Sequence, residues 1–167
     1  LNVLTRDYGK ITLKARGVRK NSSPLKGACQ LLAFSEFTYQ DFRGYFTIKE
    51  AECREMFPEL RTDIEKLSLG CYFAQATEAV SQEDDPNPAL LSLLLNALYV
   101  LAKTEKPQVL VKTAFEWRLS CLSGYEPDLG GCALCGAETP DRFNVNCGVL
   151  QCAGCESELL RGLRMPI

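Results

Sequence analysis

The chain has 167 residues, of which 46% are hydrophobic and 24% are charged, and its formal net charge is −2. This composition is typical of a globular protein, and no apolar run reaches the ~20 residues that a transmembrane helix needs. Histidine is absent, which excludes Ser-His and Cys-His nucleophile pairs and removes the usual ligand of catalytic zinc. We therefore expect a cytoplasmic protein that is not an enzyme.

Charge is distributed unevenly along the chain. Residues 1–56 carry ten Lys or Arg against six Asp or Glu, whereas residues 57–131 carry six against eleven. Within the first thirty residues, seven basic side chains face the single acid Asp7. A basic N-terminal segment on an acidic body indicates an anionic partner at one end.

Residues 1–56 read as short strands separated by turns. In the segment 10–16, Ile11 and Leu13 alternate with basic residues, as the two-residue period of a half-buried strand requires. Further strands are expected at residues 1–5, 30–40 and 45–53. This pattern predicts a small antiparallel sheet or partial barrel.

The basic residues of this region are candidates for phosphate binding because few acids are interleaved with them. They are Lys10, Lys14, Arg16, Arg19, Lys20 and Lys26. Four nearby aromatic residues could stack on bases: Tyr8, Tyr39, Phe42 and Tyr45. The alternative interpretation is plain: lysines on a half-buried strand aid solubility and protect its edge, and aromatic residues in a sheet usually belong to the core.

The pattern changes to helices over residues 57–129. Pro58 suits a first helical position, and one amphipathic helix is expected to continue from there to about Val80. Its apolar face is predicted to contain Leu60, Ile64, Leu67, Cys71 and Ala74. Asn87 is a candidate N-cap for a Leu-rich, buried second helix, and Pro107 opens a third helix that ends near Gly124.

Two Cys-x-x-Cys pairs near the C-terminus are the most specific motif. They are formed by Cys132, Cys135, Cys152 and Cys155, with sixteen residues between the pairs. Four thiolates at this spacing suit tetrahedral Zn²⁺, and a site filled by four protein ligands is structural because no position is left for water or substrate. We therefore predict a structural zinc knuckle over residues 130–156.

These cysteines have other conceivable uses. No stretch resembles a secretory signal, which argues against disulfides, and a redox dithiol would need one pair beside a βαβ pattern. Iron–sulfur ligation is a further alternative. Cys147 lies five residues before Cys152 and could compete as a ligand.

The expected class is thus α+β: a basic sheet domain (1–56), a helical domain (57–129), the zinc module (130–156) and the start of a further helix (157–167). Leu1 enters a strand-like segment without an initiator Met. We expect the intact protein to extend in both directions, because a barrel that lacks an edge strand leaves backbone groups unpaired.

The order of these parts, together with local motifs, resembles the bacterial recombination mediator family RecO. The matching stretches are "LTRDYGKITLKARGVRKNSS", "LLAFSEFT", "EMFPELRTDIEKLSLGCYFAQ", "EDDPNPALLSLLLNALYVL", "FEWRLSCLSGYEPDLGGCALCG" and "CGVLQCAGC". They cover essentially the whole chain and are specific in combination.

The resemblance implies an incomplete OB-fold followed by a helical domain with an inserted zinc site. It also implies binding of single- and double-stranded DNA, strand annealing, and recombinase loading onto DNA coated by single-strand-binding protein. The implied partners are RecR and the acidic C-terminal tail of that coating protein, and the implied location is the bacterial cytoplasm, associated with the nucleoid. The resemblance implies that this tail binds to the helical domain. Because the helical segment is itself acidic and would repel the tail, the binding site of the tail stays unassigned.

Two other functions remain open at this point. The chain could be a zinc-stabilised protein-interaction module whose basic strand binds no DNA. A nuclease using Asp63, Glu65 or Asp128 is less favoured, since no carboxylate cluster has metal-binding spacing.

Overall fold

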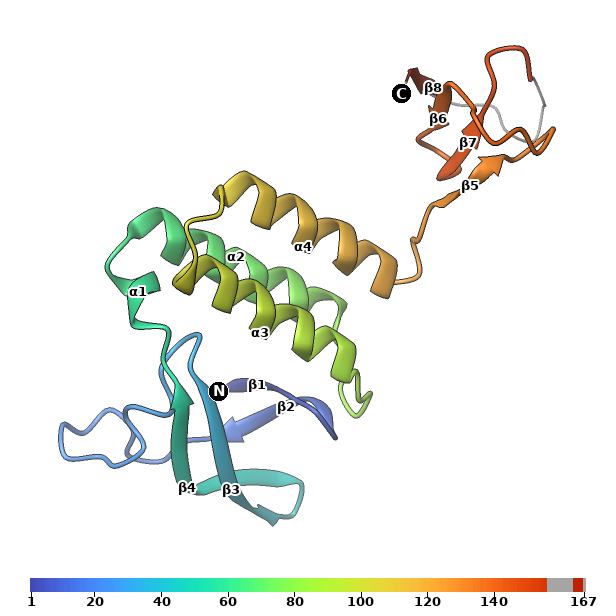
Figure 1. Cartoon of the computed structure of the whole chain (residues 1–167). Helices are drawn as coiled ribbons and strands as arrows, with labels where there is room; N and C mark the ends of the chain where they lie inside the picture. Colours follow the sequence, from blue (N-terminus) through green and yellow to red (C-terminus); the bar gives the residue numbers. More distant parts are fainter. Residues whose placement is uncertain (156–163, 167) are drawn as a thin grey trace. The chain divides into compact units, whose positions relative to one another are not determined.

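The computed structural model describes residues 1–155 and 164–166. The chain divides into two compact units, Leu1–Leu119 and Ser120–Ile167. The first unit holds a four-stranded sheet and helices, and the second is built on a smaller four-stranded sheet (Figure 1). The α+β class predicted from the sequence is therefore confirmed, while the four-part division of the chain stays a prediction.

The first sheet consists of β1 (Asn2–Thr5), β2 (Gly9–Lys14), β3 (Phe34–Phe42) and β4 (Tyr45–Glu55), in the order β1-β2-β4-β3. The β1–β2 and β3–β4 pairs are antiparallel, but β2 and β4 are parallel. The sheet is thus mixed, and the antiparallel prediction is wrong for that pair. A long connection follows β2 and leads into the β3–β4 hairpin. The second strand of this hairpin, β4, pairs with β2 and runs in the same direction.

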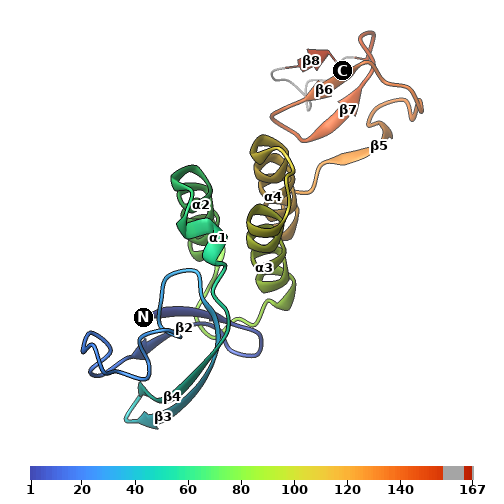
Figure 2. The same ribbon diagram turned by 60° about the vertical axis from the view of Figure 1, so that its left-hand side comes forward.

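The inner face of this sheet is apolar. Ile11 and Leu13 are 6% and 1% exposed, and they pack with Leu25 and Ile48, as the alternation along residues 10–16 predicts. The sheet remains open, consistent with an incomplete OB-like barrel, and its two longest strands, β3 and β4, form an extended hairpin (Figure 2).

The first predicted helix is in fact two helices, α1 (Pro58–Arg61) and α2 (Ile64–Val80). The break occurs because the Asp63 carboxylate accepts hydrogen bonds from the backbone N–H groups of Glu65 and Lys66, which starts a new helix. The restart changes the phase of the apolar face: Ile64 is 75% exposed, whereas Phe73 is fully buried. The prediction is therefore right for Leu60, which is 1% exposed, and wrong for Ile64.

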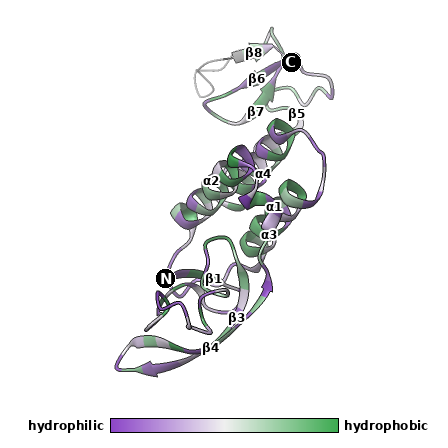
Figure 3. Cartoon of the chain, turned by 90° about the vertical axis from the view of Figure 1, so that its left-hand side faces the viewer, coloured by the Kyte–Doolittle hydropathy of each residue, from purple (hydrophilic) through white to green (hydrophobic). Residues whose placement is uncertain are grey.

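The next two helices follow the prediction closely. Asn87 caps α3 (Pro88–Lys103) by accepting a hydrogen bond from the Leu90 N–H, and α4 (Gln108–Leu122) follows Pro107. Leu98, Leu101 and Phe115 are buried where the helices pack, and apolar residues (green) recur between polar ones (purple) along the helices (Figure 3). No helix in the described part of the chain is long and apolar enough to cross a membrane.

The second unit contains β5 (Asp128–Cys132), β6 (Arg142–Asn144), β7 (Val149–Gln151) and β8 (Arg164–Pro166), in the order β5-β7-β6-β8. The sequence predicts the start of a further helix over residues 157–167. Residues 156–163 and 167 lie outside the described residues, and residues 164–166 form β8 instead of a helix, because they pair with β6.

Candidate metal centre and nucleic-acid interface

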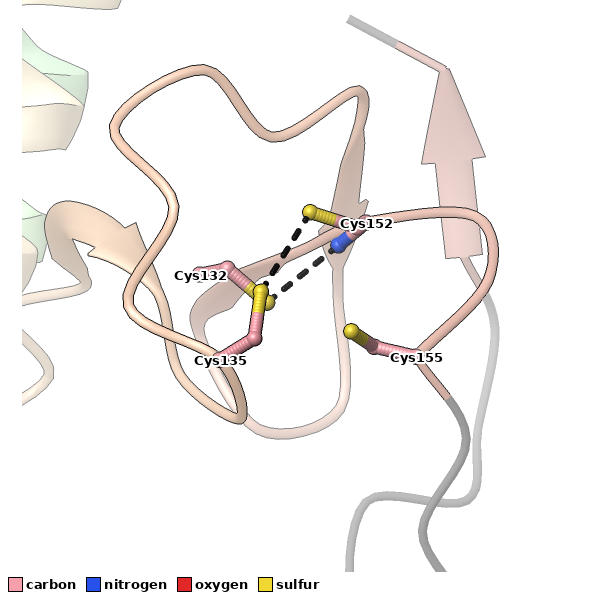
Figure 4. Close-up of side chains that lie close together, drawn as sticks. All are labelled: Cys132, Cys135, Cys152 and Cys155. Carbon is pink, nitrogen blue, oxygen red and sulfur yellow. Dashed lines mark hydrogen bonds between the residues drawn. The ribbon is translucent and has the colours of Figure 1, made fainter.

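The four predicted cysteine ligands come together in the second unit. Their sulfur atoms all lie within 4.8 Å of one another. The Cys132–Cys135 pair begins at the end of β5, and the Cys152–Cys155 pair follows β7, so two neighbouring strands position the two knuckles. All four side chains point toward a common centre (Figure 4).

The geometry fits a tetrahedral metal ion. The Cys135 and Cys152 sulfurs are 3.8 Å apart, which matches the separation of about 3.8 Å that a tetrahedral ion at about 2.3 Å from each sulfur requires. The Cys152 N–H donates to the Cys132 sulfur at 3.4 Å. An all-sulfur tetrahedral donor set suits zinc or an iron–sulfur centre.

Electrostatics within the tetrad call for a cation. Backbone N–H groups of Cys135, Leu134 and Cys152 lower the pKa of Cys132 to about 6. Burial and the neighbouring sulfurs raise the pKa of Cys152 to about 12, and hydrogen bonding with Cys135 is the main cause that raises the pKa of Cys155 to about 11. Four thiolates at this distance repel one another, so their joint ionisation requires a positive ion between them.

The surrounding loop is held by polar groups that sequence reasoning did not single out. Asp141 accepts a hydrogen bond from the Ala153 N–H inside the second knuckle. The fully buried amides of Asn144 and Gln151 hydrogen-bond to each other at 3.0 Å. Cys147 is exposed and lies outside the tetrad, and its N–H donates to Asn144. These contacts could not be predicted from the spacing of the residues in the sequence, because they form only when β6 pairs with β7.

The six predicted DNA-binding residues all lie in the first unit. Lys10 and Lys14 are on β2, and the other four lie in the turn-rich connection to β3, where their side chains are exposed: Arg16, Arg19, Lys20 and Lys26. Within the described residues, none of the six pairs with a carboxylate; the ion pairs there use Arg54, Lys103 and Lys112. Positive charge on this segment is therefore available to an external anion.

The structure distinguishes among these six. The Lys10 ammonium donates to the backbone carbonyl of Glu78 near the end of α2, so part of its charge serves the helix terminus. Lys26 donates to Asn21, whereas Lys14 lies over the Tyr45 ring at 3.5 Å from its centroid. Arg19 and Lys20 line a surface hollow of about 470 Å³.

The aromatic candidates also separate. Tyr39 packs edge-on against Phe46 within the core of the sheet, so it is a core residue and not a free surface for stacking. Phe42, Tyr45 and Tyr8 are 64%, 58% and 58% exposed.

The carboxylates considered for a nuclease do not converge. Asp63 caps α2, and Asp128 accepts a hydrogen bond from the Gly130 N–H. Among the described residues, the cysteine tetrad is the only group of three or more potential ligands close enough to share a metal ion.

Comparison with known proteins assigns the family. A model described as "Recombination protein O C terminal" matches residues 61–165, and one described as "Recombination protein O N terminal" matches residues 1–57. The chain belongs to the RecO family. The family resemblance stated from the sequence is thereby confirmed, including an OB-like N-terminal part.

RecO relatives are similar along most of the chain. Proteins named DNA repair protein RecO from Desulforudis audaxviator and Desulforamulus reducens are 37% and 35% identical over 157 and 167 residues. These matches cover 93% and 98% of this chain but 62% and 64% of the relatives. The relative from Acetivibrio thermocellus is 32% identical, with 93% and 62% covered. The chain therefore spans about three fifths of the length of these RecO relatives.

Proposed function

We propose that this chain acts in DNA repair as a non-enzymatic recombination mediator that binds single- and double-stranded DNA and promotes annealing of complementary strands. The observation that carries the proposal is the row of cations on β2 and the following loop that pair with no described carboxylate, in a chain of the RecO family. Annealing requires that two repelling phosphate backbones be neutralised while the bases stay free to pair. A basic surface without base-specific contacts meets this requirement.

Charge reversal tests this surface directly. The triple substitution Lys14→Glu, Arg16→Glu and Arg19→Glu should abolish binding of a labelled oligonucleotide measured by fluorescence anisotropy. A matched control reverses three cations on and beside α4, namely Lys106→Glu, Lys112→Glu and Arg118→Glu, which changes the net charge by the same amount. If both triples weaken binding equally, overall charge and not this surface attracts the DNA.

A salt series tests the mode of binding. For single strands, the logarithm of the affinity should fall with the logarithm of salt concentration with a slope of about −0.7 per phosphate contacted. A slope that corresponds to several contacts supports the proposal. An affinity that does not depend on salt contradicts it and favours the alternative, a zinc-stabilised protein-interaction module that binds no DNA.

We further propose that the cysteine tetrad holds structural Zn²⁺. The ion would be bound by Cys132, Cys135, Cys152 and Cys155, and it would stabilise the second unit without contributing a reactive position. The support is the donor set and the sulfur spacing. Metal analysis of the purified chain should find zinc at one ion per chain; iron with sulfide would identify an iron–sulfur centre instead.

Recombinase loading onto DNA coated by single-strand-binding protein is the most specific part of the proposal. It includes RecR and the C-terminal tail of the coating protein as partners, and a cytoplasmic, nucleoid-associated location. The support is membership of the RecO family. Pull-down of the chain with each purified partner tests this part, and failure with both would restrict the function to DNA binding and annealing.

A further inference from the structure

The turn between β3 and β4 presents two exposed aromatic rings at the end of a β-hairpin. Phe42 and Tyr45 are 64% and 58% exposed, and they are direct partners across the hairpin. Side chains of such a cross-strand pair project from the same face of the sheet. Figures 1 and 2 both show this turn at the end of the two longest strands.

Each ring carries a cation against it. The Lys14 ammonium lies 3.5 Å from the Tyr45 centroid, and the Arg43 guanidinium lies 5.2 Å from the Phe42 centroid. Lys14 pairs in register with Thr47, two residues from Tyr45, so β2 and β4 bring cation and ring to one face. The opposite face of the same strands is the buried side, which includes Leu13 and Ile48.

The backbone conformation of the turn determines where these side chains start. Arg43 and Gly44 have φ values of 53° and 77°, the left-handed pair that a two-residue hairpin turn favours. The Asp41 carboxylate accepts a hydrogen bond from the Gly44 N–H, so the nearest acid is engaged in the turn. A left-handed conformation is uncommon for a residue other than glycine, and it places the Arg43 side chain at the tip.

Charge changes sign along the hairpin. At the end remote from the turn, Glu36 and Glu52 both pair with Arg54, and in the middle of β4 Lys49 and Glu50 are both exposed. Acids at that end repel phosphate, whereas Lys14 and Arg43 at the tip attract it. The tip, where Lys14 and Arg43 outnumber Asp41, is therefore the part of the hairpin that attracts phosphate.

We propose that the tip formed by Lys14, Phe42, Arg43 and Tyr45 is a stacking site for unpaired bases of single-stranded DNA. This inference rests on the proposed DNA-binding function and adds strand discrimination to it. Phe42 and Tyr45 stack on bases, while Lys14 and Arg43 neutralise the adjacent phosphates. In a duplex, the faces of the bases are covered by neighbouring base pairs, so the aromatic contact is specific to a single strand.

The test compares three probes of equal length by anisotropy: a labelled thymine strand, an abasic strand with the same phosphates, and a duplex. Wild-type chain should bind the thymine strand more tightly than the abasic strand. The Phe42→Ala and Tyr45→Ala substitutions should each weaken thymine-strand binding at least about fivefold, the lower limit for one base–aromatic stack. Affinity for the abasic strand and for the duplex should not change.

Two controls separate stacking from damage to the fold. Tyr99→Ala removes a similarly exposed ring, 55% against 58% for Tyr45, from α3, and it should leave all three affinities unchanged. Phe42→Trp and Tyr45→Trp keep an aromatic face and should retain the preference for the thymine strand.

The outcomes distinguish the inference from the proposed function. If the alanine variants bind the thymine strand as wild type does while salt-dependent binding persists, DNA binding stands and the stacking site is overturned. If alanine variants lose affinity for all three probes equally, the rings support the fold and the stacking site is again overturned. If no probe binds wild-type chain, both proposals fall.

Discussion

Cys135 and Cys147 are both exposed thiols of the second unit, but only Cys135 lies in the sulfur tetrad. Sequence spacing could nominate either, because both lie within reach of Cys152 along the chain. The pairing of β5 with β7 decides between them by placing Cys132 and Cys135 beside Cys152. At the scale of single residues, the paired motif was enough to predict which four cysteines come together, whereas the position of Cys147 outside the tetrad required the structure.

This difference gives a direct prediction. Cys135→Ser should reduce the metal content well below one ion per chain, because one of four ligands is lost. Cys147→Ser should leave metal content unchanged. Metal analysis after dialysis measures both, and equal loss in the two variants would show that Cys147 is also a ligand.

Gly9 is a second residue at which one added side-chain atom should change the stability of the fold. Its φ is +65°, and a Cβ atom there would lie 2.4 Å from the backbone oxygen of Asp85. Gly9→Ala should lower the free energy of unfolding by about 2–5 kcal/mol, the sum of left-handed strain and overpacking. Urea titration measures the change.

Gly17 supplies the matched control for this substitution. It has a similar φ of +72°, but a Cβ atom there would meet no atom within 4 Å. Gly17→Ala should therefore cost only the left-handed strain, about 1–2 kcal/mol. Equal losses at both positions would contradict the steric argument.

At the scale of elements, caps and breaks decided which predictions were right. Asn87 and Pro88 identified the start of α3 correctly, because a cap followed by proline is a local signal. Asp63 is also a cap, but the periodic apolar residues on both sides masked the break between α1 and α2. The parallel contact between β2 and β4 had no local signal at all, because it depends on how the β3–β4 hairpin docks.

A buried aromatic pair joins α2 to α4. The Phe73 and Phe115 rings are stacked with centroids 4.2 Å apart, and Phe115 is 2% exposed. Phe115→Ala should cost about 3–5 kcal/mol of unfolding free energy because it empties a buried site. Trp117→Ala on the same helix, at a residue 51% exposed, should cost less than about 1 kcal/mol. Thermal or urea unfolding compares them, and similar losses would refute this assignment of the core.

Lys103 links three elements through its ammonium. It lies 2.7 Å from Glu59 of α1 and 3.9 Å from Glu55 of β4. The hydrogen bond from Lys103 lowers the pKa of Glu59 below its ordinary value of 4.5. A lowered pKa in the folded state means that the stabilisation is present above pH 4.5 and is lost as the pH falls through the folded pKa.

Stability should therefore decline between about pH 5 and pH 3 more steeply in wild-type chain than in Glu59→Gln, which has no carboxylate to protonate. Because both side chains are partly exposed, the difference should be small. Unfolding free energies measured across this range provide the check. Identical slopes in the two proteins would show that the ion pair does not contribute.

At the scale of the whole molecule, the chain consists of two compact units with different means of stabilisation. The first unit has two apolar clusters, one in the sheet and one among the helices. In the second unit, Cys132 is the only buried apolar residue among those described, and two further buried residues are the amides Asn144 and Gln151. We therefore expect a unit with so small a core to depend on the metal ion proposed for its cysteine tetrad.

Metal removal should therefore affect the two units differently. Chelation should increase amide hydrogen exchange across residues 130–155, because structural zinc contributes on the order of 10 kcal/mol of apparent binding energy. Amides in α2, α3 and α4 should keep their protection and serve as the internal control. Unchanged exchange in residues 130–155 after verified metal loss would show that the second unit folds without the ion.

The α+β class, the family, the cysteine tetrad and the starts of α3 and α4 could all be predicted from the sequence, because each is encoded by local spacing or by residues close together in the chain. Three features could not be predicted in this way: the mixed order of the first sheet, the Asn144–Gln151 pair, and the approach of Lys14 to the turn that carries Phe42, Arg43 and Tyr45. The sheet order and the approach of Lys14 to the tip depend on pairing between distant segments, and the Asn144–Gln151 pair depends on how β6 pairs with β7. The register of such pairing is set by the burial of whole faces and not by any short motif.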